Sequence, residues 1–150
     1  MERGLFMKIV LNKPFGGFGL SVAGLEYYYR LKGIQEFFYY ISFRDRATNE
    51  KYYKKPSTDN ELLDAYVFTK DFGPDGIIDI SSEDFEKYFL ADFDIERTDK
   101  DLVKTVRDLG EAANGAHSDL VIVEIPDDVK WQIEEYDGME WVAEVHRTWG

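Results

Sequence analysis

The chain contains no cysteine, which excludes a disulfide framework, a thiol nucleophile and a thiolate metal site. Its two histidines do not have the His-x-x-x-His or His-Glu-x-x-His spacing of a zinc site. No segment approaches the run of about 18 apolar residues that a membrane span needs, and the first residues lack the apolar core of a signal peptide. We therefore expect a cytoplasmic protein that uses no cofactor and holds no metal.

Positive charge is also scarce. The chain has 18 lysines and arginines against 30 aspartates and glutamates, a formal net charge of −12. Such a field repels phosphate backbones and anionic membranes, so we expect neither nucleic acid nor a membrane as a partner. A basic protein surface would be attracted, whereas a small anionic ligand would need a local cluster of Arg or Lys. Both of these partner classes stay open.

Catalytic side chains are few. No serine lies in the Gly-x-Ser-x-Gly context of a nucleophile elbow, so only carboxylates remain as candidate acids or bases. Asp127-Asp128 and Glu134-Glu135 are adjacent in sequence. Neighbours on a strand point to opposite faces, so neither doublet forms a dyad. We expect a protein that is not an enzyme.

The length of 150 residues fits one domain. A first helix is predicted between Ser21, in the N-cap position, and Gly33, in the C′ position. The predicted fold class is α+β, a mostly antiparallel sheet with two main helices and a C-terminal β-hairpin. β-branched and aromatic runs predict strands over residues 7–12, 37–43 and 120–125.

The second helix is predicted to begin after Thr98 or Asp99, because apolar residues then recur at helical spacing. Asn114-Gly115 is the expected left-handed stop. Gly110 lies inside this helix and lowers its stability by up to about 1 kcal/mol relative to alanine. We expect a close packing partner to be the reason for that glycine.

The C-terminal segment predicts a hairpin. Asp137-Gly138 lies between two alternating apolar runs, the strongest short signal of a two-residue hairpin turn. All three tryptophans lie in this segment, and we expect Trp131 and Trp141 in the core. We expect the terminal residues 146–149 to lie outside the core and to contribute to a possible binding site.

Residues 71–83 have two interpretations. In the first, a strand through Val67 and Thr69 turns at residues 73–76 and returns through residues 78–80. In the second, the segment resembles an EF-hand calcium loop, but the third position is a glycine and Glu83 comes one residue too late for the bidentate carboxylate. The hairpin is preferred.

The Gly-rich turn from Phe15 to Ser21 lies between a strand and a helix N-terminus, where backbone N–H groups can hold an anion. It matches neither a dinucleotide nor a Walker-type phosphate motif. Either Phe15 and Phe18 pack into the core, or one of their rings stacks on a base. Asn12, just before the turn, would offer its amide to a base edge.

Arg97 and Arg147 are candidate phosphate ligands, because guanidinium groups bind phosphate with two hydrogen bonds. Asn114 is a candidate for amide recognition of a base. The alternatives are an ion pair at the surface for Arg147 and a helix C-cap for Asn114. We list the candidate ligand-binding set as Asn12, Phe15, Phe18, Arg97, Asn114 and Arg147.

Three groups of segments show a resemblance to known proteins. They are Lys8-Ile-Val-Leu-Asn12 with Phe15-Gly-Gly-Phe-Gly-Leu-Ser21; Arg97-Thr-Asp-Lys-Asp-Leu-Val103 with Leu109-Gly-Glu-Ala-Ala-Asn-Gly115; and Glu124-Ile-Pro-Asp-Asp-Val-Lys-Trp131 with Glu135-Tyr-Asp-Gly138 and His146-Arg-Thr-Trp149. Together they resemble small phage and prophage proteins, which we identify as the Thoeris anti-defence sponge family. Residues 7–33 and 95–149 would be the family-like core, and residues 34–94 a variable insertion.

This resemblance implies a function. Members of that family bind cyclic ADP-ribose isomers, in some cases cyclic oligonucleotides, and assemble as dimers or higher oligomers. The chain would therefore be a homo-oligomeric phage protein that sequesters a cyclic nucleotide immune signal in the infected host cell without cleaving it. The alternative is an acidic inhibitor that binds a basic host protein or mimics nucleic acid, which the charge of −12 motivates. A third hypothesis, a hydrolase or calcium-regulated protein, rests on the loop at residues 71–83.

Overall fold

The computed structural model describes residues 5–73 and 76–145. The chain forms two compact units: unit 1 is Met1–Gly24 with Asp92–Gly150, and unit 2 is Leu25–Ala91. The prediction of one domain with an insertion at residues 34–94 stays a prediction. Unit 2 differs from that insertion because it begins inside the first helix.

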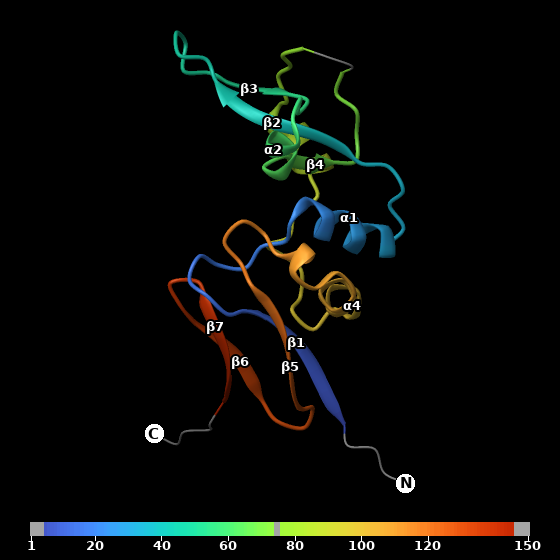
Figure 1. Cartoon of the computed structure of the whole chain (residues 1–150), viewed down its shortest axis with the longest axis vertical. Helices are drawn as coiled ribbons and strands as arrows, with labels where there is room; N and C mark the ends of the chain where they lie inside the picture. The colour runs from blue at the N-terminus through green and yellow to red at the C-terminus, as the bar shows by residue number, and fades with distance from the viewer. Residues whose placement is uncertain (1–4, 74–75, 146–150) are drawn as a thin grey trace. The chain divides into compact units, whose positions relative to one another are not determined.

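Unit 1 is built on two antiparallel strands, β1 (Phe6–Asn12) and β5 (Leu120–Pro126), in which Ile9 lies opposite Val123. Ile9, Val10 and Leu11 in β1 are all buried, so this strand is covered on both faces, as its continuous apolar run predicts. Helix α4 (Lys100–Leu109) lies beside both strands (Figure 1).

Helix α4 begins as predicted and ends earlier. The Asp99 carboxylate caps it by accepting hydrogen bonds from the backbone N–H groups of Asp101 and Leu102. The left-handed stop predicted at Asn114-Gly115 is wrong, because Gly110 has φ +57° and Asn114 is extended. A short 3₁₀ turn, η1 (Gly110–Ala113), follows. A Cβ on Gly110 would meet nothing within 4 Å, so its backbone conformation, not a packing partner, requires glycine.

The C-terminal hairpin is confirmed, with β6 (Trp131–Tyr136) antiparallel to β7 (Met139–Glu144). Asp137 and Gly138 have φ of +53° and +88°, the positive values that a type I′ turn requires. The prediction that Trp141 lies in the core is wrong, because its side chain is 41% exposed. Trp141 lies opposite Glu134, whereas Trp131 lies opposite Glu144 on the other face. Trp131 is half-buried.

Helix α1 (Val22–Leu31) has both predicted ends. The Ser21 hydroxyl accepts a hydrogen bond from the Gly24 N–H at 2.9 Å. At the other end Gly33 has φ +102°, and the N–H groups of Gly33 and Ile34 donate to the carbonyls of Arg30 and Tyr29, each at 3.0 Å. These are the two hydrogen bonds of a Schellman motif.

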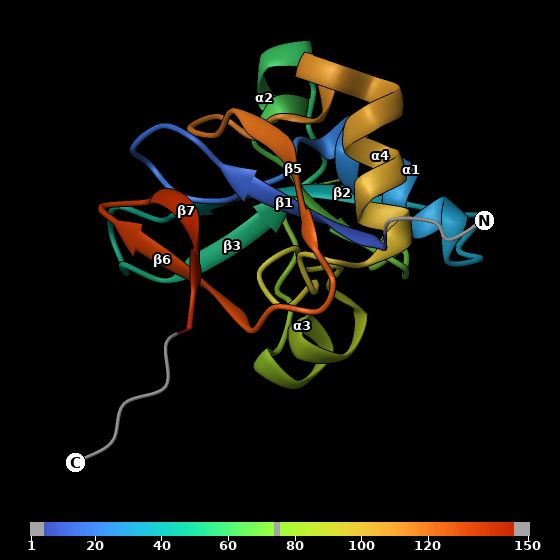
Figure 2. The ribbon, with the colours of Figure 1, turned by 90° about the horizontal axis from the view of Figure 1, so that it is seen from below.

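Unit 2 contains a three-stranded antiparallel sheet in the order β3 (Lys51–Lys54), β2 (Phe38–Arg44), β4 (Tyr66–Phe68). The unit also contains two short helices that were not predicted, α2 (Asp59–Leu63) and α3 (Ser82–Tyr88). Figure 2 shows strand β3 and helix α3 of this unit. Tyr40, Tyr53, Phe68 and Ile80 form the buried core of the unit. Phe85 of α3 packs on it with an edge-to-face contact to Phe68 at 5.3 Å between ring centroids.

The hairpin predicted around residues 73–76 is wrong. Ile78 pairs with Tyr53 of β3 through two backbone hydrogen bonds of 2.9 Å, whereas β4 is bridged by Phe89. The Asp71 carboxylate, the first ligand of the alternative calcium loop, accepts hydrogen bonds from the Tyr40 hydroxyl and the Gly73 N–H. Asp75 lies outside the described residues, so the calcium interpretation stays open at that position.

The predicted α+β class is confirmed, with antiparallel strand pairs, two longer helices and the C-terminal hairpin. Among residues 5–73 and 76–145, no helix combines the length and the apolar character needed to cross a bilayer. In the same residues no group of three or more His, Cys, Asp or Glu side chains is placed to hold a metal ion.

Candidate anion-binding site

Arg97, a predicted phosphate ligand, forms an ion pair with Glu140 of β7. Its Nη1 and Nη2 lie 2.5 Å and 2.8 Å from the two carboxylate oxygens, the two-pronged geometry that would otherwise meet a phosphate. The side chains are only 20% and 8% exposed. Water screens such a pair poorly, so removal of one partner leaves the other charge unpaired at a partly buried position.

The pair also completes the free edge of β1. The Val10 N–H donates to the Arg97 carbonyl at 2.9 Å, and the Asn12 N–H donates to Glu140 Oε1 at 2.8 Å. Arg97 Nη1 lies 3.4 Å from the Val10 carbonyl. The Arg97 carbonyl and the side chains of Arg97 and Glu140 thus take the place of a neighbouring strand, and the role that this geometry gives Arg97 is structural.

The amide of Asn12 is completely buried. Its Nδ2 donates to the carbonyls of Pro14 at 2.8 Å and Gly138 at 2.7 Å, and its Oδ1 accepts from the Asp119 N–H at 2.9 Å. Both N–H groups and the oxygen are therefore in use. Asn12 joins β1, the turn before β5 and the hairpin turn.

Asn114 lies close to this cluster. Its Oδ1 accepts a hydrogen bond from the Leu120 N–H at 2.9 Å, and its Nδ2 donates to the Asp119 carboxylate at 3.4 Å. Asp119 also donates its N–H to Asn12. The structure therefore brings Asn12, Asn114 and Arg97 into one region of unit 1, where their polar groups bind the protein itself.

The two predicted aromatic residues differ. Phe18 is half-buried, and the guanidinium carbon of Arg97 lies 3.8 Å from the centre of its ring, a cation–π contact. Phe15 is 58% exposed and meets the ring of Tyr136 edge-on at 6.4 Å. Of these two rings, Phe15 is the one that is exposed enough to meet a ligand ring. Arg147 lies outside the described residues.

A different group of cations lines a groove between β1 and α4. The groove has a volume of about 550 Å³, within the range of small-molecule sites. Four of the chain's 18 lysines and arginines lie along it, within an otherwise acidic chain. It is lined by Phe6, Met7, Lys8, Thr98, Lys100, Asp101, Val103, Lys104 and Arg107.

The helix sets the spacing of three of these charges. Lys100, Lys104 and Arg107 are four and three residues apart in α4, so they lie on one face of the helix. Lys8 extends from β1. A row of positive charges of this kind can bind an anion that carries more than one negative group.

The ion pairs of these cations are exposed and exchangeable. Lys104 lies 2.9 Å from Asp108, Arg107 lies 3.5 Å from the same carboxylate, and Lys8 lies 3.8 Å from Glu124. Exposed pairs of this kind contribute about 0–1 kcal/mol. A bound anion can therefore compete for these cations at small cost, unlike for Arg97.

The groove also has an apolar part. Phe6 is 60% exposed and lies beside Met7 and the buried Val103. An exposed ring beside a row of cations offers stacking for a base together with contacts for its phosphates. The lining supplies hydrogen-bond donors and a stacking surface, and His117, the described histidine, is not part of it.

The site residues predicted from the sequence rest on single residue types, and none of those that the structure describes lines the groove between β1 and α4. Its signal was present in the sequence as the spacing of Lys100, Lys104 and Arg107 within a predicted helix. No family model, no curated protein and no solved structure matches the chain.

Proposed function

We propose that the protein binds and sequesters a small cyclic nucleotide signal without cleaving it, as a phage anti-defence protein acting in the infected host cell. The ligand would be a cyclic ADP-ribose isomer or a cyclic oligonucleotide. The observation that carries the proposal is the gathering of Lys8, Lys100, Lys104 and Arg107 beside the exposed ring of Phe6 in one groove.

Each group has a role in this proposal. The ammonium and guanidinium groups bind the phosphates, and Phe6 stacks on the base. Asp101, the carboxylate of the groove, accepts a hydrogen bond from a ribose hydroxyl or a base amine. The net charge of −12 disfavours long nucleic acids, which would extend beyond the local cations.

The groove is formed by one strand and one helix, and tight sequestration requires most of the ligand surface to be covered. We therefore include self-association in the proposal, with a second copy of the chain closing the groove over the ligand. A dimer or higher oligomer in solution supports this part, and a monomer in the presence of saturating ligand overturns it.

The test is calorimetry with cyclic ADP-ribose isomers and with cyclic di- and trinucleotides, followed by heating of the complex and chromatography of what is released. We expect at least one of these ligands to bind and to be recovered intact. Failure of all of them to bind contradicts the proposal. Recovery of cleaved ligand would make the protein an enzyme.

A second candidate function has its own observation. Asp127, Asp128, Glu134 and Glu135 are all exposed, on or just before the hairpin strand β6. An acidic strand of this kind suits an inhibitor that binds a basic face of a host protein. Its complex should weaken steeply as salt rises from low to high ionic strength, and binding that is insensitive to salt would exclude it.

A further inference from the structure

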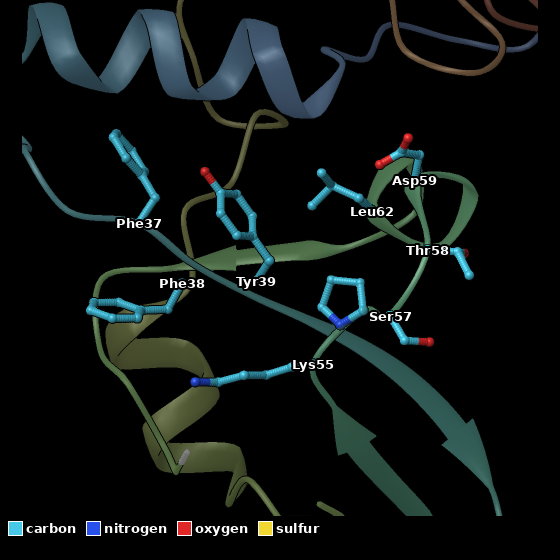
Figure 3. A pocket seen from close by; sticks show the side chains of 9 residues that line it. Phe37, Phe38, Tyr39, Lys55, Ser57, Thr58, Asp59 and Leu62 are labelled. Atoms are coloured by element: carbon cyan, nitrogen blue, oxygen red, sulfur yellow. The ribbon is translucent and has the colours of Figure 1, made fainter. Parts of the chain in front are cut away.

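Unit 2 contains a pocket of its own, of about 420 Å³ (Figure 3). One side is the start of β2, with Phe38 and Tyr39, and the other is the link from β3 to α2, with Lys55 and Pro56. Leu62 of α2 closes the space between them. The groove along α4 has no residue in common with this pocket.

The walls of this pocket are mainly apolar. Figure 3 shows Leu62 directed toward the ring of Tyr39, and Pro56 belongs to the same lining. The Tyr39 hydroxyl points away from Lys55, and it makes a hydrogen bond with Glu26. Burial, followed by that hydrogen bond, raises the pKa of Tyr39, so the residue presents a neutral ring. The space suits a flat hydrophobic group.

Two polar groups at the edge of the pocket already serve helix α2. The Ser57 hydroxyl donates to Glu61 at 2.6 Å, and the Thr58 hydroxyl accepts the Glu61 N–H at 3.1 Å. These contacts form the N-cap of α2. A ligand therefore cannot take these hydroxyls without weakening the helix.

Lys55 is the available cation. Its ammonium lies 3.4 Å from Asp71, and the pair is about one-third to one-half exposed. Asp71 has other donors, the Gly73 N–H and the Tyr40 hydroxyl, which with Lys55 lower its pKa. An ammonium has three N–H donors, so Lys55 can keep Asp71 and still bind a second carboxylate. Figure 3 shows the Asp59 carboxylate at the opposite side of the pocket, where it repels a second negative group.

We propose that this pocket binds a planar aromatic monocarboxylic acid. The ring lies among Tyr39, Pro56 and Leu62, and the carboxylate binds the ammonium of Lys55. One positive and one negative residue at opposite sides select for a single carboxylate at one end of the ring. A site of about 420 Å³ holds an acid of one or two rings.

The test uses the full chain and three indole compounds of similar size, titrated by calorimetry or followed by saturation-transfer NMR. They are indole-3-acetate, the neutral tryptophol and the cationic tryptamine. We expect the acid to bind at least about tenfold more tightly than tryptophol, because a hydrogen bond to a charged group adds that much. Tryptamine should bind no better than tryptophol. Equal binding of acid and alcohol, or no binding of indole-3-acetate at millimolar concentration, overturns the proposal.

Variants locate the site. Lys55→Gln should remove the preference for the acid, and Lys55→Arg should retain it. Lys87→Gln, on the exposed face of α3, removes the same charge elsewhere in unit 2 and should leave the preference unchanged. Leu62→Trp should fill the pocket and weaken all three compounds. A Lys55→Gln protein that folds and still prefers the acid contradicts the assignment, whatever the outcome for Leu62→Trp.

Discussion

Two groups of cations in unit 1 contrast with each other. Arg97 is mostly buried, bound to Glu140 by two hydrogen bonds and covered by Phe18. Lys104 and Arg107 stand on the exposed side of α4 and share one exposed carboxylate, Asp108. In the first arrangement the hydrogen bonds of Arg97 to Glu140 are mostly buried, so a ligand cannot easily replace them. In the second, a bound anion can replace Asp108 as the partner of the cations.

The difference separates a cation that holds the fold from cations that can bind a ligand. Arg97 has the residue type and planar geometry of a phosphate ligand, but its carbonyl accepts from the Val10 N–H and its guanidinium donates to the Val10 carbonyl at the edge of β1. The ion pairs of Lys104 and Arg107 with Asp108 in the groove along α4 are exposed and contribute little to folding, so an anion can compete with Asp108 for these cations. Substitutions in the two groups should therefore change different properties.

The largest effect is expected at Glu140. Glu140→Ala leaves the Arg97 charge without its partner and the Asn12 N–H without an acceptor. We expect the free energy of unfolding to fall by about 3 kcal/mol, measured by urea denaturation. Glu144→Ala, an exposed residue of the same strand, is the control and should change it by less than about 0.5 kcal/mol. Similar values for the two would show that the ion pair does not hold the fold.

A second effect concerns the buried amide. Asn12→Asp keeps the size of the side chain but replaces the two N–H donors to Pro14 and Gly138 by an oxygen. We expect a loss of about 2 kcal/mol in the free energy of unfolding. Asn60→Asp, at an exposed position in α2, should be near neutral. A stable Asn12→Asp protein that loses only ligand binding would return Asn12 to the binding site.

The groove should show the reverse pattern. The double variant Lys104→Gln/Arg107→Gln removes two donors and should weaken nucleotide binding about 10- to 100-fold. Its free energy of unfolding should change by less than about 0.5 kcal/mol, because the pairs with Asp108 that it removes are exposed. Lys70→Gln/Lys87→Gln removes the same charge from unit 2 and should bind like the wild type. A large loss of stability in the first pair would contradict the distinction drawn between the two groups.

The smallest effect is expected at Asp71. Its side chain is exposed, like the cations of the groove, but it has several partners, like Arg97. The Gly73 N–H and then the Tyr40 hydroxyl hold the pKa of Asp71 below the ordinary value of an aspartate. A lowered pKa adds stability that is fully present above the unfolded value and is lost as the pH falls through the folded one. Thermal melts of wild type and Asp71→Asn should therefore differ at pH 6 and converge below pH 4. A constant difference across that range would exclude the linkage.

Local signals in the sequence predicted much of the fold. Ser21 and Gly33 mark the two ends of α1, Asp99 caps α4, and Asp137-Gly138 forms the hairpin turn. Each of these depends on residues close together in the chain, where residue type largely decides the backbone conformation.

The errors come from geometry that joins distant residues. A two-residue turn places odd-numbered residues of β6 opposite even-numbered residues of β7, so Trp131 and Trp141 lie on opposite faces although both belong to alternating runs. Glu140 gave no sign in the sequence that it would bind Arg97. In contrast, Lys100, Lys104 and Arg107 have the spacing of one helix face in the sequence itself. This charge pattern within a predicted helix indicates a basic groove, which single residue types do not.

One experiment tests the central claim most directly: calorimetric titration of cyclic ADP-ribose isomers and cyclic di- and trinucleotides into the wild type and Lys104→Gln/Arg107→Gln, with the melting temperature of each protein measured alongside. The account predicts a ligand that binds the wild type, binds the variant at least about tenfold more weakly, and leaves the melting temperatures of the free proteins equal. Undiminished affinity in the variant, or no binding of any of these ligands to the wild type, would contradict it.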